Sequence, residues 1–176
     1  MKLNEMCSIR YGKDHKHLKD GRIPTYGSGG IIRYADTAIC SNRSILIPRK
    51  GTLDNLFFVK EPFWTVDTMF WTIINENIVV PEYLYYCLLT KDLASMNVGT
   101  AIPSLTVDLL NEIEIDLPPI KEQHRIVDVL ISLDDKITNN MKINHHLATR
   151  SVTDNSPHMR RGKRASRRLI RYSDSC

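Results

Sequence analysis

A pair of prolines, Pro118-Pro119, separates two segments with different hydrophobic patterns. Before this pair, apolar residues form short runs divided by turn residues, as in a small sheet-containing domain. After it, apolar residues recur at alternating spacings of four and three residues, the pattern of a coiled-coil helix. These positions are Ile126, Leu130, Leu133, Ile137 and Leu147. We therefore expect a globular part at residues 1–118 and a long helix at residues 119–149.

The first 80 residues predict strands, because their apolar runs are short and rich in Ile, Val, Phe, Trp and Thr. The runs cover residues 31–32, 44–48, 56–59, 64–66 and 69–74. Trp64, Phe70 and Trp71 in these runs are expected in the core rather than as stacking platforms. Asp67 is expected to fix a turn rather than to catalyse.

Helical spacing begins at Pro81, which stands at the first position of a segment with Leu84 and Leu88 on one face. A short helix is expected at residues 107–111. Residues 112–117 alternate in period two and predict a strand. The predicted fold class is α+β: a mixed β-sheet with a few helices, followed by a long coiled-coil-type helix.

The coiled-coil seam also includes Asn140 and Asn144, which lower stability and can fix the pairing register. We expect the seam to bind an external partner. The alternative is a helix packed on its own domain.

Positive charge is concentrated at the C-terminal end, where residues 151–176 hold seven Lys/Arg and two Asp/Glu. The preceding residues carry a net charge near −1, so net charge does not argue for a nucleic-acid partner. The segment from residue 150 onward has no apolar periodicity and is expected to be a disordered basic tail. A DNA-tethering arm is the alternative.

The cellular location is expected to be the cytoplasm. The four cysteines form no CxxC pair, which favours free thiols in a reducing compartment. No segment approaches the roughly 18 apolar residues of a membrane span.

A series of short motifs occurs in a fixed order along most of the chain. The motifs are YGK at 11–13, GRIPTYGSGGI at 21–31, ILIPRKGT at 45–52, FWTVDTMF at 63–70, YLYY at 83–86, GTAIPSL at 99–105, LPP at 117–119, EQ at 122–123, IV at 126–127 and LDDKI at 133–137. Through them, residues 1 to about 148 resemble the type I restriction-modification specificity subunits.

The resemblance implies a target-recognition domain that reads one half of an interrupted site in double-stranded DNA. It further implies a spacer helix that recruits the modification (methyltransferase) and restriction subunits. Full-length members of the family carry two such units and this chain carries one, as in a half-length or truncated form. A homodimer or a second specificity half is therefore expected as a further partner.

Candidate DNA contacts lie in several segments, one of which is a positive cluster that includes Lys13 and Lys16 and could equally be an exposed loop. The glycine-rich YGSGG loop permits close approach to DNA, although a tight hairpin turn would read the same way. The PRKGT segment places two cations at a strand end, where they would contact phosphates or remain solvated. Arginines in loops suit guanine edges. The candidates are Lys13, Lys16, Tyr26, Ser28, Arg33, Arg43, Arg49, Lys50 and Thr100.

Catalytic motifs are missing from the sequence. Residues 117–120 (LPPI) lack the acid or amide and the aromatic residue of a methyltransferase motif, and no P-loop or zinc cluster occurs. We expect no catalysis and no cofactor in this chain; by the resemblance, S-adenosylmethionine, ATP and magnesium belong to partner subunits. Two alternatives remain: a fragment that binds partner subunits without reading DNA, and an enzyme that acts alone.

Overall fold

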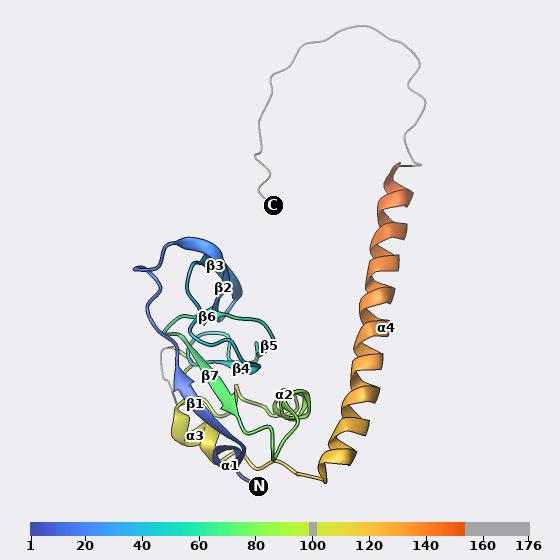
Figure 1. Ribbon diagram of the computed structural model, residues 1–176. Coiled ribbons are helices and arrows are strands. Elements are labelled where there is room, and N and C mark those ends of the chain that lie inside the picture. Colours follow the sequence, from blue (N-terminus) through green and yellow to red (C-terminus); the bar gives the residue numbers. More distant parts are fainter. Residues whose placement is uncertain (99–101, 154–176) are drawn as a thin grey trace, which may run out of the picture. The chain divides into compact units, whose positions relative to one another are not determined.

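The computed structural model describes residues 1–98 and 102–153, with side chains to residue 144 (Figure 1). The elements in chain order are α1 (Leu3–Met6), β1 (Cys7–Tyr11), β2 (Asp20–Gly27), β3 (Gly30–Ala35), β4 (Ser44–Pro48), β5 (Phe57–Val59), β6 (Trp64–Thr65), β7 (Met69–Ile74), α2 (Pro81–Leu89), α3 (Val107–Asn111) and α4 (Ile120–Thr153). Residues 1–132 form one compact unit, and α4 continues into a second.

The main sheet has four strands in the order β1-β7-β4-β5, and all neighbours pair antiparallel. Strand β4 is buried along its whole length because neighbours flank both edges and the core packs on its faces. The larger core cluster joins this sheet to α1, α2, α3 and the start of α4. Trp64 and Phe70 are buried, which confirms their predicted place in the core.

The second sheet has three strands in the order β3-β2-β6. Strands β2 and β3 form an antiparallel hairpin, while β2 and β6 pair in parallel through Thr25–Trp64 and Tyr26–Thr65. In Figure 1 this sheet lies at the end of the domain opposite α1 and α3. The α+β class and the mixed strand pairing are confirmed, with the strands divided between two sheets.

Gly12 is the crossing point between the sheets. Its N–H donates to the carbonyl of Met69 at 2.9 Å, and the next N–H, of Lys13, donates to the carbonyl of Thr65 at 2.9 Å. A Cβ at Gly12 would stand 2.0 Å from the carbonyl oxygen of Val66. Only glycine therefore lets β1 leave the main sheet so close to the loop after β6.

The prediction of a strand at residues 112–117 is wrong. This segment makes a single bridge, between Lys2 and Glu114, and pairs only with the first residues of the chain. The ladder cannot extend because Leu3 already begins helix α1. The predicted alternation is nevertheless present in the burial, since Ile113 and Ile115 are both buried.

Helix α4 begins at Ile120, one residue after the predicted start, and continues to Thr153. Its first turns pack on the domain, where Gln123 and Val127 are buried. From Ile131 to Asn144 every side chain is exposed. Among residues 1–98 and 102–153, no helix combines the length and apolar character that a membrane crossing requires. Residues 154–176, most of the predicted tail, lie outside the described residues.

Candidate nucleic-acid interface

Three loops that are far apart in sequence meet at one corner of the domain. The Gly51 N–H donates to the carbonyl of Pro103 at 3.1 Å, and the Leu105 N–H donates to the carbonyl of Arg49 at 2.9 Å. The side chain of Asn55 donates to the carbonyl of Ser28 at 2.8 Å. Residues 49–51 are thus joined to residues 103–105 by backbone hydrogen bonds, and Asn55 holds the YGSGG loop on the same surface.

Gly51 has the backbone conformation that this meeting requires. Its φ is +93°, in the region that favours glycine. A Cβ there would stand 3.4 Å from the hydroxyl oxygen of Ser28. The turn that follows the PRK residues therefore lies against the tip of the β2–β3 hairpin. The YGSGG loop is a hairpin turn, and it lies beside the turn that follows Arg49 and Lys50.

Arg49 is held at this corner by contacts that leave part of its guanidinium exposed. Its Nε donates to the carbonyl of Asp67 at 2.8 Å, and its guanidinium lies 5.8 Å from the ring centroid of Tyr11. Lys50 is exposed and makes no ion pair in the part of the chain that the structure describes. Asp67 contributes its backbone carbonyl here, so this contact does not test the role predicted for its side chain. Two cations are therefore presented beside glycine, an arrangement that suits contact with an anionic group.

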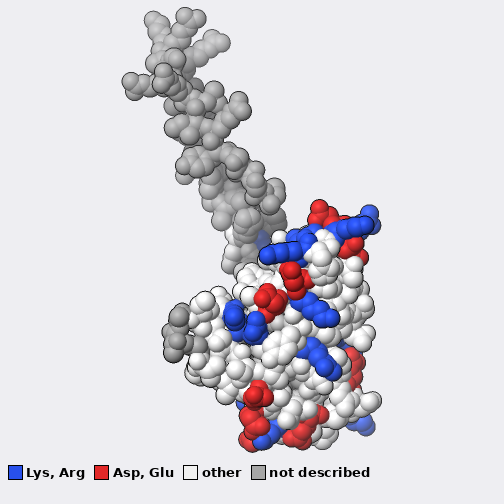
Figure 2. Space-filling view, turned by 90° about the vertical axis from the view of Figure 1, so that its left-hand side faces the viewer, with Lys and Arg blue, Asp and Glu red and all other residues white. Residues whose placement is uncertain are grey.

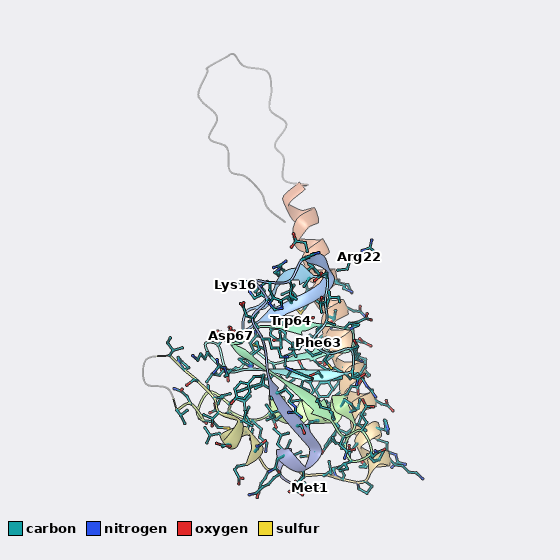
Figure 3. The ribbon with its side chains drawn as sticks, turned by 60° about the vertical axis from the view of Figure 1, so that its left-hand side comes forward. Met1, Lys16, Arg22, Phe63, Trp64 and Asp67 are labelled. Atoms are coloured by element: carbon teal, nitrogen blue, oxygen red, sulfur yellow. The ribbon has the colours of Figure 1, made fainter. Side chains whose placement is uncertain are left out.

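Lys13 and Lys16 belong to the loop between β1 and β2. The indole N–H of Trp64 donates to the carbonyl of Lys13 at 3.1 Å. The Lys16 N–H donates to the carboxylate of Asp14 at 3.1 Å, and this hydrogen bond lowers the pKa of Asp14 below its ordinary value. Figure 3 shows Lys16 and Arg22 at the end of the domain away from Met1.

Charge on this part of the molecule is mixed rather than uniformly positive. Figure 2 shows Lys and Arg side chains gathered at one end of the domain, with Asp and Glu side chains between them. This surface is therefore not uniformly positive. Its attraction for an anionic partner depends on where the individual cations lie.

Arg33 is committed to an internal role. Its guanidinium donates to the carboxylate of Asp20 at 2.6 Å and to the carbonyl of Leu18 at 3.2 Å. These bonds hold the β1–β2 loop against strand β3. These bonds use guanidinium N–H groups of Arg33, so fewer of them remain to contact a guanine edge than we expected from the sequence.

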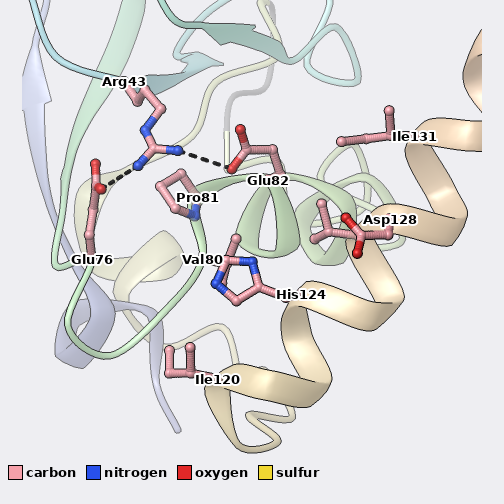
Figure 4. Close-up of a pocket in the computed structure, with 10 residues that line it drawn as sticks. Arg43, Glu76, Val80, Pro81, Glu82, Ile120, His124, Asp128 and Ile131 are labelled. Atoms are coloured by element: carbon pink, nitrogen blue, oxygen red, sulfur yellow. Dashed lines mark hydrogen bonds and ion pairs between the residues drawn. The ribbon is translucent and has the colours of Figure 1, made fainter.

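Arg43 lies in a different place altogether. It bridges the carboxylates of Glu76 and Glu82 beside helix α2, next to a pocket of about 350 Å³ that His124 and Asp128 of α4 also line (Figure 4). The structure does not bring Arg43 together with Arg49 and Lys50. Thr100, the remaining candidate, lies outside the described residues.

The residues of the predicted seam on α4 differ in how far they are buried. Ile126 and Leu130 are half-buried, and Ile126 packs against the core of the domain. Leu133 and Ile137 are 47% and 57% exposed. The side chain of Leu147 lies outside the described residues. Val129 and Met141, which the heptad pattern did not single out, are exposed as well.

Gln123 was named in the sequence only as part of the EQ motif, and its structural role was not predicted. It is 1% exposed, and its side-chain amide contacts both the segment before α4 and the start of α2. Its spacing of three from Ile120 and four from Val127 was the available signal, because these positions share one helix face.

No group of three or more His, Cys, Asp or Glu side chains in the described parts of the chain could hold a metal ion. Cys7, Cys40 and Cys87 are free thiols, as predicted for them.

Comparison with known proteins agrees with the resemblance. The family model for the type I restriction modification DNA specificity domain matches residues 1–148. The type I restriction enzyme MjaIX specificity subunit of Methanocaldococcus jannaschii is 34% identical over 120 residues, covering 66% of this chain and 28% of that protein. The HindI specificity subunit of Haemophilus influenzae is 34% identical over 125 residues, covering 67% and 25%.

Solved structures share the fold. An S subunit of a type I restriction-modification system from M. genitalium superposes with a TM-score of 0.71 at 17% identity, covering 84% of this chain and 42% of that one. The HsdS subunit from Thermoanaerobacter tengcongensis gives a TM-score of 0.63 at 17% identity, covering 79% and 38%. The chain belongs to the type I restriction modification DNA specificity domain family, which confirms the family predicted from the motifs. It spans about a quarter of the length of the two relatives from M. jannaschii and H. influenzae.

Proposed function

We propose that this chain reads one half of a bipartite site in double-stranded DNA through the corner where the YGSGG, PRKGT and GTAIPSL motifs meet. The observation that carries the proposal is the placement of Arg49 and Lys50 beside Gly51. Backbone hydrogen bonds join this loop to residues 103–105, and the side chain of Asn55 holds the YGSGG loop beside it. Cations on a fixed loop neutralise phosphates and set the register in which neighbouring side chains meet base edges.

Catalysis in this proposal belongs to partner subunits. The chain carries no cofactor of its own and supplies the DNA contact and a docking helix. The exposed part of α4 supports docking, because the side chains from Ile131 to Asn144 are exposed. Modification and restriction subunits are the proposed partners at this helix. The protein is proposed to act in the cytoplasm, where its DNA lies.

A second copy of the chain is the proposed partner along the seam. Antiparallel pairing of two α4 helices would place a recognition domain at each end of the pair. A two-fold dimer would then read the same half-site twice in opposite orientations, so the target would be an interrupted palindrome.

Selection of bound duplexes from a random pool, followed by sequencing, tests the proposal. We expect enrichment of one short sequence, repeated in inverted orientation at a fixed spacing. Enrichment of a single unpaired half-site would refute the dimer but retain DNA reading. Absence of any preferred sequence would refute DNA reading and favour a chain that only docks partner subunits. Cutting or methylation of DNA by the purified chain alone would refute the non-catalytic role.

A further inference from the structure

Strand β3 carries apolar side chains on the surface that the phosphate contacts do not explain. Ile31, Ile32 and Tyr34 are 48%, 51% and 52% exposed. They lie within a single six-residue strand at the edge of the three-stranded sheet. Apolar side chains concentrated on so short a strand mark a contact surface more often than single exposed residues do.

A β-bulge places two of these side chains, Ile31 and Tyr34, away from the loop that Arg33 holds. Thr25 pairs with Arg33 and the next residue, Tyr26, pairs with Ile31, so Ile32 has no partner on β2. Tyr34 pairs with Pro24, which shares a face with Tyr26 because successive residues of a strand alternate. Ile31 and Tyr34 therefore share one face of the hairpin, and the paired Arg33 lies on the other.

The hairpin is fixed at its turn, and the side of β3 is exposed beside it. Asn55 holds the turn through the carbonyl of Ser28. The outer edge of β3 pairs with no other strand of the described chain. The exposed surface is consequently the length of β3 from Ile31 to Tyr34.

The segment that contains this apolar strip also carries several cations. Residues 13–36 hold five Lys/Arg and three Asp, and the Arg33 guanidinium neutralises Asp20. Lys16, Lys19 and Arg22 are exposed and make no ion pair within the described residues. An apolar strip in a segment with several cations suits a partner whose surface carries both negative charges and apolar groups.

The major groove of duplex DNA has this character, because phosphates line it and thymine methyl groups project into it. It also has the width to admit a two-stranded β-ribbon. We propose that the β2–β3 hairpin enters the major groove and that Ile31, Ile32 and Tyr34 contact thymine methyl groups. The proposal rests on the DNA-reading function above and assigns part of its base selectivity. The thymine methyl is an apolar group that cytosine lacks at the same ring position, so this contact selects thymine.

Deoxyuridine substitution tests the contact directly, because it removes the methyl group and leaves every hydrogen-bonding group in place. The duplex selected by the wild-type chain is synthesised with deoxyuridine at each thymine in turn, and affinity is measured by titration. We expect a three- to fourfold loss for each contacted methyl. The variant Ile31→Ser/Ile32→Ser/Tyr34→Ser should bind the thymine and deoxyuridine duplexes equally.

Two further variants separate the contact from a folding effect. Ile31→Val/Ile32→Val/Tyr34→Phe keeps the strand apolar and should retain the methyl dependence. Ile73→Ser removes an isoleucine of similar exposure, 46%, from β7 of the other sheet and should also retain it. Thermal melting of each variant establishes that it is folded.

Equal wild-type affinity for thymine and deoxyuridine duplexes would overturn the proposal while leaving DNA reading intact, and would assign the β3 strip to a protein partner. A selected sequence without thymine, or full methyl dependence in the serine variant, would overturn it in the same way. A wild-type chain with no sequence preference would overturn this proposal together with the proposed function.

Discussion

The backbone N–H of Val80 donates to the side-chain oxygen of Gln123 at 2.8 Å, joining the residue before helix α2 to the first turns of helix α4. The other end of the same amide donates to the carbonyl of Pro118 at 2.9 Å. One buried side chain thus satisfies backbone groups from two segments. The start of α4 is fixed to the domain by this bond pair and by the burial of Val127.

Replacing Gln123 with alanine should destabilise the domain by about 1–3 kcal/mol, because the buried Val80 N–H would lose its acceptor. Urea unfolding followed by circular dichroism measures the change. Lys121→Ala, an exposed change two residues earlier in the same helix, serves as the control and should alter stability by less than about 0.5 kcal/mol. Equal stability of the two variants would show that water replaces the amide.

Replacing Arg49 or Lys50 with alanine should weaken binding to all DNA sequences by a similar factor. Each change removes one phosphate contact, so the slope of log affinity against log salt should fall by about 0.9. Titration at several salt concentrations gives the slope. Arg43→Ala removes the same charge from a site beside α2 and should leave the slope unchanged. A changed sequence preference at constant slope would instead make Arg49 or Lys50 a base-reading residue.

Acidic substitutions on α4 should separate folding from assembly. Leu133→Glu with Ile137→Glu changes exposed positions, so the unfolding temperature should stay within a few degrees while the proposed dimer dissociates. Val127→Ala changes a buried position and should cost about 0.5–2 kcal/mol of stability without a direct effect on pairing. Light scattering and thermal melting give the two readouts. A wild-type chain that is monomeric at tens of micromolar would refute the pairing.

Cys7 should resist alkylation in the folded protein. Burial raises the pKa of its thiol to about 12, so almost no reactive thiolate exists at pH 8. Mass spectrometry after iodoacetamide treatment should show Cys7 unmodified under native conditions and modified in urea. The half-buried Cys40 in the same sample should react faster. Rapid native modification of Cys7 would indicate that α1 and β1 open locally.

The local sequence pattern was sufficient to predict those elements whose burial depends on their own residues. The SILIP run at residues 44–48 is a strand, and Pro81 begins helix α2, because the hydrophobic run and the proline determine these elements locally. Residues 112–117 failed as a strand because pairing depends on a partner, and the only partner available turns into a helix at Leu3. Period-two burial and strand pairing are separate properties.

The sequence predicted which loops form the candidate site, but it did not predict which side chains pair with the arginines. Glycine and cation patterns indicated the YGSGG and PRKGT loops, and the fold brings them together. The partners of Arg33 and Arg43 were not predicted, because Asp20 meets Arg33 only across the β2–β3 hairpin and Glu82 meets Arg43 only where helix α2 lies beside it. An arginine in a loop does not reveal whether the fold supplies it with a carboxylate.

The segments that close the domain lie far apart in the order of synthesis. The Leu3 N–H donates to the carbonyl of Ile113, and the Ile115 N–H donates to the carbonyl of Met1, while β1 pairs with residues 70–74. A growing chain therefore makes β1 long before its partners, and such distant contacts slow folding. Helix α4 follows immediately after the last of these partners. Its anchor at Val80 forms only on a nearly finished domain, so the proposed recruitment of partners along the helix should come after the domain has folded.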